Sequence, residues 1–294
     1  MWVTGIADGE ASFFISIFKD KDYKLGWQIQ PAFAIGLHQK DLHLLEQIKA
    51  FFGVGTIRMN KKSGICHYSV SSKKDLYNVI IPHFIKYPLL TQKRADFILF
   101  KMAIDLIIKG QHLTAKGLQQ ILSIRASMNK GLTKALTEAF PNIIPENRPK
   151  IEITEIKDPY WIAGFSCGES CFDVNILKNI KYKLGFQVQI RFRISQHERD
   201  RALLALISKY LKCGTLQTSR HTVELTIVNL EDIINIIIPF FDKYHLKGIK
   251  QLDYACFRQV AFLMGKKAHL TAEGLEQIRQ IKAEMNKGRN HDES

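Results

Sequence analysis

Two glutamates, Glu10 and Glu169, occupy the same place in two copies of one short phrase. The first copy reads WVTGIADGEASF from Trp2, and the second reads WIAGFSCGESCF from Trp161. Each glutamate follows a run of small and apolar residues, which is typical of a closely packed helix. If two such helices pack together, their carboxylates converge where both helix dipoles are negative, and divalent cations stabilise that arrangement.

This arrangement predicts a particular chemistry. Proteins hold Mg²⁺ with one or two carboxylates together with phosphate oxygens and water. A pair of such ions can activate water and stabilise the leaving oxygen of a phosphodiester. The pattern therefore predicts metal-dependent phosphodiester hydrolysis at Glu10 and Glu169. The alternative is that both are exposed polar residues at helix ends, which their matching positions disfavour.

Paired glycines explain how two helices could approach so closely. Gly5 and Gly9 lie four residues apart, as do Gly164 and Gly168. Small residues at this spacing form a flat helix face on which another backbone packs. We therefore expect the two phrases to form one helix pair.

The duplication extends over most of the 294-residue chain. The segment HLTAKGLQQILSIRASMNKG, at 112–131, matches HLTAEGLEQIRQIKAEMNKG, at 269–288, while 132–157 has no counterpart and contains three prolines. Prolines interrupt regular structure. We expect an N-terminal half at 1–131, a linker at 132–157 and a C-terminal half at 158–290.

The elements that must position the phrases follow the same order in each half: a helix, two strands, a helix, two strands and further helices. Residues 186–195 alternate between apolar and polar side chains, as does 27–36, and this indicates strands with one buried face. The expected fold is α+β, with two pseudo-symmetric αββαββα(α) halves. Each half has a twisted antiparallel sheet with helices packed on one face.

Composition favours a polyanionic partner, because the formal net charge is +14. No apolar run is long enough for a membrane span, so no membrane partner is expected. Five cysteines without a C-x-x-C pair support neither a zinc site nor a disulfide framework. A solvated sheet face is the simple alternative to a binding face.

The polar faces of the strands are rich in Gln, Arg, Ser, Thr and Asn, which suit the edges of bases in a major groove. Neighbouring lysines, such as Lys24 and Lys183, would neutralise phosphates. The expected DNA-binding residues are Ser12, Phe14, Ser16, Phe18, Lys19, Gln28, Gln30, Ala32, Ala34, Gly36, Thr56, Arg58, Asn60, Ser69, Ser71, Asp173, Asn175, Leu177, Lys178, Gln187, Gln189, Arg191, Arg193, Ser195, Thr215, Gln217, Ser219, Thr222, Glu224 and Thr226.

The two phrases resemble the doubled motif of single-chain LAGLIDADG homing endonucleases of the fungal mitochondrial intron-encoded type. The segments YKLG, LHQKD, QHERD, HFIKYPLLTQK, HLTAKGL and AFPNIIP extend the resemblance over both halves. The resemblance implies that Glu10 and Glu169 bind the catalytic metals, with the backbone carbonyls of Gly9 and Gly168 as further ligands. It also implies Mg²⁺ as cofactor, with Mn²⁺ or Ca²⁺ able to replace it, Ca²⁺ without cleavage.

Further expectations follow from the resemblance. A monomer would read a long pseudo-palindromic or asymmetric target in the major groove of double-stranded DNA. It would hydrolyse one phosphodiester per strand and leave short 3′ overhangs. Mitochondrial localisation, with synthesis inside the organelle, is also implied. Two alternatives stay open: an intron RNA maturase, and a non-cleaving DNA-binding protein on the same scaffold.

The chain departs from the family pattern at several positions. Ala11 and Ser170 stand where the family usually has glycine, which would cost about 1 kcal/mol if that position needed a positive φ. Positional matching makes Gln196 and Lys247 the candidates for the family's water-organising Gln and basic residue. Leu37 and Leu90 occupy the corresponding N-terminal positions, so unequal cutting of the two strands is expected.

The two motif helices also differ at their starts. Asp158 can cap the second, and Pro159 suits its first turn, whereas the first begins at Met1 and Trp2 without a cap. A trimmed, originally longer N-terminus is therefore expected.

Overall fold

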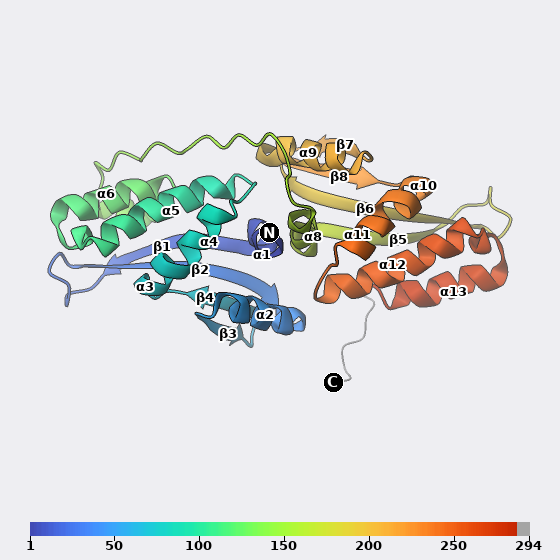
Figure 1. The fold of residues 1–294 in the computed structure, drawn as a ribbon, viewed down its shortest axis with the longest axis horizontal. Helices are drawn as coiled ribbons and strands as arrows, with labels where there is room; N and C mark the ends of the chain where they lie inside the picture. The colour runs from blue at the N-terminus through green and yellow to red at the C-terminus, as the bar shows by residue number, and fades with distance from the viewer. Residues whose placement is uncertain (287–294) are drawn as a thin grey trace. The chain divides into compact units, whose positions relative to one another are not determined.

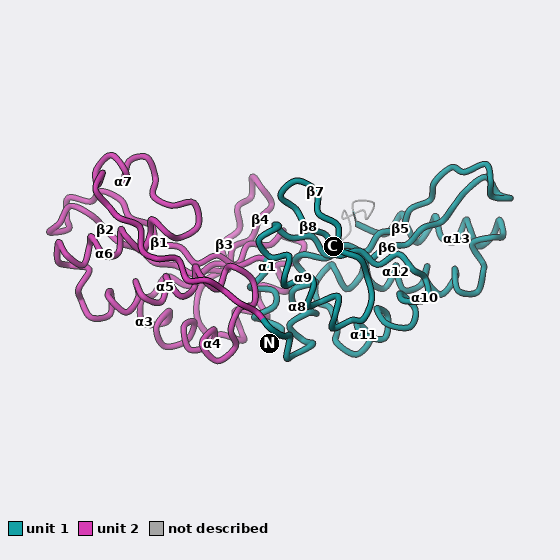
Figure 2. The backbone as a smooth tube through the Cα atoms, turned by 90° about the horizontal axis from the view of Figure 1, so that it is seen from above, with its two compact units in different colours: residues 1–9, 154–294 teal, residues 10–153 magenta. Residues whose placement is uncertain are grey.

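The computed structural model describes residues 1–286, and the end of the expected C-terminal half, at 287–290, lies outside the described residues (Figure 1). The backbone divides into two compact units (Figure 2). One joins Met1–Gly9 to the chain from Thr154 onward, and the other comprises Glu10–Ile153. The expected halves follow the sequence repeat, whereas the units follow packing. The first helix packs with the second half of the chain.

The unit Glu10–Ile153 contains a four-stranded antiparallel sheet with strand order β1-β2-β4-β3. Helix α5 packs on β1, and α2 packs on β2, β3 and β4. A π-helical turn, Leu76–Ile80, leads into α4. The elements are β1 (Ala11–Lys19), β2 (Trp27–His38), α2 (Leu42–Phe52), β3 (Thr56–Asn60), β4 (Ile65–Val70), α3 (Lys73–Asp75), α4 (Ile81–Lys86), α5 (Lys93–Ile108), α6 (Ala115–Ala126) and α7 (Lys134–Ala139).

The other unit repeats this arrangement with strand order β5-β6-β8-β7. Helix α12 packs on β5, α9 packs on β8, and a π-helical turn, Ile233–Ile237, leads into α11. Its elements are α1 (Trp2–Glu10), which extends one residue past the unit boundary, α8 (Pro159–Glu169), β5 (Ser170–Lys178), β6 (Phe186–His197), α9 (Arg201–Leu211), β7 (Thr215–Ser219), β8 (Thr222–Ile227), α10 (Leu230–Asp232), α11 (Ile238–Lys243), α12 (Ile249–Gly265) and α13 (Ala272–Ala283). The expected α+β class with two repeated halves is confirmed.

One face of each sheet is buried under helices, as the alternation predicts. On β6, Val188, Ile190, Phe192 and Ile194 are buried, and the intervening residues are at least partly exposed. An aromatic ring at the same position of each repeat centres the core. Phe13 lies 5.1–5.5 Å from its ring neighbours, and Phe172 lies 5.0–5.7 Å from its own. These neighbours are Phe33, Phe84, Phe97 and Phe100, and then Phe192, Phe241, Tyr254 and Phe257.

An asparagine closes each repeat onto its own first strand. Asn129, at φ 50°, donates from Nδ2 to the Phe13 carbonyl oxygen at 2.9 Å. Asn286, at φ 51°, makes the same bond to Phe172 at 3.2 Å. Asparagine tolerates left-handed backbone better than most residues. The repeated MNKG segment therefore anchors the final helix to the sheet, although its last two residues in the second copy lie outside the described part of the chain.

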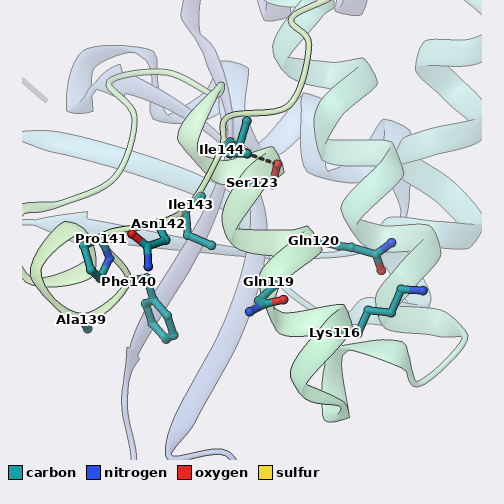
Figure 3. A pocket seen from close by; sticks show the side chains of 10 residues that line it. All are labelled: Lys116, Gln119, Gln120, Ser123, Ala139, Phe140, Pro141, Asn142, Ile143 and Ile144. Atoms are coloured by element: carbon teal, nitrogen blue, oxygen red, sulfur yellow. Dashed lines mark hydrogen bonds between the residues drawn. The ribbon is translucent and has the colours of Figure 1, made fainter.

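The linker crosses the unit Glu10–Ile153 and contains a short helix, α7, before Pro141. Arg148 forms a bidentate ion pair with the buried Asp96 carboxylate, with both Nη–Oδ distances at 2.8 Å. Ser123 on α6 donates to the Ile144 carbonyl oxygen (Figure 3). An open pocket lies where the linker meets α6. These contacts fix the linker to one unit.

No helix of residues 1–286 is long and apolar enough to cross a membrane. All five cysteines are free thiols.

Candidate active site and nucleic-acid interface

Helices α1 and α8 pack with their backbones in contact, as the glycine pattern predicts. A Cβ built on Gly5 would lie 2.1 Å from the Trp161 carbonyl oxygen and 2.7 Å from the Phe165 nitrogen. A Cβ built on Gly164 would lie 2.0 Å from the Trp2 carbonyl oxygen. No side chain fits such distances. The two glycines therefore meet the opposite helix reciprocally, and only glycine permits this crossing.

A buried hydrogen bond fixes the same helix pair. Trp161 Nε1 donates to Asp8 Oδ2 at 2.8 Å, and Asp8 is 3% exposed. Cys167 holds the position of Asp8 in the second copy, and the indole nitrogen of Trp2 is buried without a hydrogen-bond partner among residues 1–286. A buried polar group without a partner destabilises the fold. The helix pair is thus symmetric in its glycines and asymmetric in its polar contacts.

Both expected catalytic glutamates end a motif helix, and a strand begins at the next residue. Glu10 ends α1 and Glu169 ends α8, and both are half-buried. The Glu169 carboxylate lies against Gly9, where a built Cβ would be 3.2 Å from Oε1. Glu10 directly follows Gly9 in the chain. The structure therefore places Glu169 beside the end of α1, while Gly168 is half-buried on α8.

Ala11 and Ser170 adopt ordinary strand backbone. Ser170 has φ −94° and ψ 160°, and Ala11 is absent from the positive-φ residues of the described chain. The position after the acid therefore does not require glycine, and the anticipated strain is not present. Ser170 also donates from Oγ to the Ser166 carbonyl oxygen at 2.6 Å, which satisfies an otherwise open acceptor near the helix end.

The oxygen donors at the helix ends fit a hard divalent cation. Carboxylates and backbone carbonyls are the ligands that Mg²⁺ and Ca²⁺ take in proteins. Within residues 1–286, no group of three or more His, Cys, Asp and Glu side chains could hold a metal by itself.

Two lysines lie near the end of α8. Lys247 donates from its backbone nitrogen to Cys167 Sγ at 3.3 Å, and its ammonium lies 5.2 Å from the centre of the Trp2 ring. Lys250, in the first turn of α12, places Nζ 2.5 Å from the carbonyl oxygen of Ser170. Ser170 directly follows Glu169, so Lys250 puts a positive charge next to the expected metal ligand.

The sequence reasoning missed Lys250, although the repeat carried a signal for it. Lys93 stands at the matching position in the first copy, in the first turn of α5, whereas Lys247 is matched by Leu90. Because the glutamate occurs in both copies, a lysine that also occurs in both copies is the better candidate for a basic partner. Asp8 was missed because its counterpart in the second copy is Cys167, so comparison of the two copies does not single it out.

Gln196 lies close to the end of α8 along the sheet. Ser170 pairs with Ile194 in the register of β5 and β6, and Gln196 follows two residues later on the same face of β6. Leu37 holds the same place beyond Ile35, which pairs with Ala11. Gln196, which is polar, and Leu37, which is apolar, therefore occupy equivalent positions in the two sheets.

Most of the expected DNA-binding side chains lie on the open faces of the two sheets. Three do not: alternation along β1 and β5 places Lys19 and Lys178 on the opposite side, and Ser71 follows the end of β4. Cross-strand pairing joins Ser12 to Ala34 and Asp173 to Arg191, so partners on neighbouring strands face the same way. Ala32, at 8% exposure, is the one buried member of the set, since Phe14 is its direct cross-strand neighbour. The open face of each four-stranded sheet is thus mostly accessible to solvent.

Exposed lysines surround these faces. Lys21 and Lys24 lie on the loop between β1 and β2, and Lys181 and Lys183 lie on the matching loop between β5 and β6. Each loop closes with a left-handed glycine, Gly26 or Gly185. The positive charges of these lysines lie where the phosphates of a polyanion bound along the sheet would contact them.

Ion pairs occupy the middle of the β5-β6-β8 face. Asp173 contacts Arg191 and Arg193, and Glu224 contacts Arg193. The sequence analysis predicted these residues as separate DNA contacts and did not predict that they contact one another.

Comparison with known proteins identifies the relatives of the chain. A family model described as LAGLIDADG endonuclease matches residues 3–104 and 162–261. The "Probable intron-encoded endonuclease 3" of Neurospora crassa is 44% identical over 282 residues, which cover 94% of this chain and 52% of that protein. "Probable intron-encoded endonuclease 2" of the same organism is 39% identical, covering 96% of this chain and 64% of that protein. The chain thus spans about half to two thirds of these relatives.

Solved structures match over nearly the full length. I-SmaMI bound to cleaved DNA superposes with a TM-score of 0.95 at 40% identity, covering 98% of this chain and 97% of that chain. I-SmaMI bound to an uncleaved DNA target with calcium ions gives 0.95 at 40% identity, covering 97% and 98%. I-CpaMI bound to uncleaved DNA gives 0.93 at 42% identity, covering 97% and 99%.

Proposed function

The chain belongs to the LAGLIDADG endonuclease family, and on that premise we propose that it is a site-specific, Mg²⁺-dependent endonuclease that cleaves both strands of duplex DNA. The observation that carries the proposal is the doubled motif helix, in which each copy ends on a glutamate and the glycines bring the two backbones into contact. A non-cleaving DNA-binding protein would not need both carboxylates.

The residues at the helix ends take distinct roles in this proposal. Glu10 and Glu169 hold divalent cations, with the carbonyl oxygens of Gly9 and Gly168 and the phosphate groups of the target as further donors. A cation held by these residues would supply the means to activate water and to stabilise the leaving oxygen of the phosphodiester. Similarity to I-SmaMI, which has been solved with Ca²⁺ on an uncleaved target, supports Ca²⁺ as a non-cleaving substitute.

Basic and polar residues next to the glutamates complete the site. Lys250 contacts the Ser170 carbonyl oxygen and is suited to stabilise negative charge that develops on the phosphate. Lys93 takes the same role in the first copy. Gln196 orients water from β6, and Lys247, packed on Trp2, has the more structural position. The difference between Gln196 and Leu37 supports unequal rates on the two strands.

The open sheet faces bind the target in its major groove, and the surrounding lysines contact phosphates. Several finer features belong to the proposal by family membership. The chain acts as a monomer, reads a long target that is pseudo-palindromic or asymmetric, and leaves short 3′ overhangs. Mitochondrial localisation is supported by intron-encoded relatives, such as a Podospora anserina protein of ND4 intron 1.

A plasmid library with randomised inserts tests the proposal. Incubation with the purified chain and Mg²⁺ is expected to linearise a specific subset of plasmids, and omission of metal is expected to prevent this. Sequencing of the ends then gives the cut positions on each strand. Failure to linearise any insert, combined with tight binding to intron RNA, would overturn the nuclease proposal in favour of a maturase.

A further inference from the structure

A connected group of ionised and polar side chains lies on the open face of the β5-β6-β8 sheet. Asp173 Oδ2 accepts from Arg191 at 3.2 Å from Nε and 3.1 Å from Nη2. The same oxygen lies 3.0 Å from Arg193 Nε, in an ion pair without hydrogen-bond geometry. Glu224 Oε2 accepts from Arg193 Nη1 at 3.2 Å and from Ser195 Oγ at 2.9 Å. We call Asp173, Arg191, Arg193, Ser195 and Glu224 the arginine network.

Strand register explains why these side chains meet. Asp173 is directly opposite Arg191, and Ser195 is directly opposite Glu224. Arg193 lies between these two pairs along β6, so both carboxylates reach it diagonally. Arg193 is therefore held from the strands on both sides, and Arg191 from β5 alone. These contacts restrict the orientation of each guanidinium.

The surroundings favour the charged forms of Glu224 and Arg193. Burial acts to raise the pKa of Glu224, but hydrogen bonds from Ser195 and Thr226 and the charge of Arg193 outweigh it, so the pKa is lowered from its usual value. Burial likewise opposes the charge of Arg193, and Asp173, Cys171 and Glu224 together outweigh it, so its pKa is raised. Two carboxylates on a surface that would face phosphates are unfavourable by themselves. Their presence therefore needs a compensating role.

The first repeat shows that the sheet does not need the network to fold. At the matching register positions the β1-β2-β4 face has Phe14, Ala32, Ala34, Gly36 and His67, and none is an arginine or a carboxylate. The strand order and pairing are nevertheless the same. The network is thus a property of one binding face, and a general requirement of the fold does not explain it.

We propose that Asp173 and Glu224 are positioning residues that hold Arg191 and Arg193 for bidentate contact with guanine. On the β1-β2-β4 face, Phe14 and Ala34 at the matching positions read A·T pairs through thymine methyl groups. This rests on the proposed DNA-binding function. Arginine recognises guanine through two donors aimed at O6 and N7, and small apolar side chains contact the thymine methyl. Arg191 Nη1 takes no part in the bonds to Asp173, and Arg193 Nη2 takes none in the contacts with Asp173 and Glu224, so each guanidinium keeps donors for a base.

The consequence is a target with two unlike halves. The half-site under the β5-β6-β8 face has guanines at the positions read by Arg191 and Arg193. The half-site under the β1-β2-β4 face is A·T-rich at the matching positions. The carboxylates contribute to selectivity by orienting the arginines and by repelling phosphates at misaligned sites.

Selection from a randomised duplex pool tests the proposal. The full chain is incubated with the pool in Ca²⁺, bound duplexes are sequenced, and affinities for single-base variants of the best target are measured. Guanine preference is expected at one half-site, and Arg191→Lys and Arg193→Lys are each expected to reduce it by roughly 10- to 100-fold, because lysine keeps the charge but lacks the fork. Thermal melting checks that each variant is folded.

Asp173→Asn separates positioning from a merely structural role. It removes a negative charge from the binding face, so affinity for the unselected pool is expected to rise while guanine discrimination falls. A loss of stability alone would lower affinity for all sequences together. Asp242→Asn is the matched control, because Asp242 also pairs with an arginine, Arg258 at 3.1 Å, on helices α11 and α12. It is expected to leave base preference unchanged.

The outcomes distinguish this inference from the proposed function. A pool that yields no bound duplex overturns both. Specific binding without guanine preference, or guanine preference that survives both arginine substitutions and Asp173→Asn, overturns the arginine network's role and leaves the nuclease proposal standing.

Discussion

The substitution Gly164→Ala tests the helix crossing most severely. The added methyl would lie 2.0 Å from the Trp2 carbonyl oxygen and 2.9 Å from its carbonyl carbon, both of which are backbone atoms. No flexible side chain can move aside, so α1 and α8 would have to separate by about 1 Å to reach tolerable contact. Every contact of the pair would be affected, including the bond between Trp161 and Asp8.

The expected cost can be worked from this geometry. Overpacking a close contact costs about 3 kcal/mol at the upper end, and the helix preference of alanine over glycine returns about 1 kcal/mol. The net loss is then about 2 kcal/mol, or a fall in melting temperature of about 4–8 °C for a unit of this size. Calorimetry or denaturant unfolding, monitored by circular dichroism, measures it.

Gly9→Ala is the matched control. Its methyl would meet only the end of the Glu169 side chain, with Cγ and Oε1 both at 3.2 Å. That side chain can rotate, so stability is expected to change little while the carboxylate moves and cleavage falls. The reasoning is refuted if Gly164→Ala melts like the parent chain, or if Gly9→Ala loses stability and keeps full cleavage.

Three further predictions concern other contacts. Lys250→Ala is expected to slow cleavage by about 10²-fold or more, and Lys247→Ala by much less; equal losses in single-turnover assays would contradict the assignment. Asp96→Ala is expected to cost about 2 kcal/mol of unfolding free energy, less than a fully buried pair, because the Arg148 side chain is 35% exposed; unchanged denaturant midpoints would argue against the linker anchor. The stability that Glu224 contributes is present above its ordinary pKa of 4.5 and is lost as pH falls through its lowered folded-state pKa; the difference in melting temperature between the parent chain and Glu224→Gln should therefore shrink in acid, and a constant difference would contradict it.

Much of the fold could be predicted from the sequence because each element is indicated by the residue pattern in both copies of the repeat. Alternation on β6 identified the buried face, and the glycines at Gly5 and Gly164 identified the helix contact that the backbone makes. Spacing carries such information because a residue's position in a helix or strand determines the face on which its side chain lies.

Other features were not readable from spacing. The link between Arg148 and Asp96 joins residues far apart in the chain, one of them in the unrepeated linker. The strain anticipated at Ala11 and Ser170 depended on a backbone conformation that these residues do not adopt. The arginine network required the register of three strands, because Asp173 and Glu224 carry no mark in the sequence that separates a base contact from a positioning role.

Replacing each motif glutamate by glutamine tests the central claim most directly. Glu10→Gln and Glu169→Gln keep the size and hydrogen-bonding capacity of the side chain and remove the charge that would hold a cation. Cleavage of the selected target in Mg²⁺ and affinity for it in Ca²⁺ are measured side by side. Each variant is expected to lose double-strand cleavage and to retain most of its affinity for the target. Undiminished cleavage by either variant, or loss of binding in step with cleavage, would contradict the proposal that these two carboxylates hold the catalytic metal.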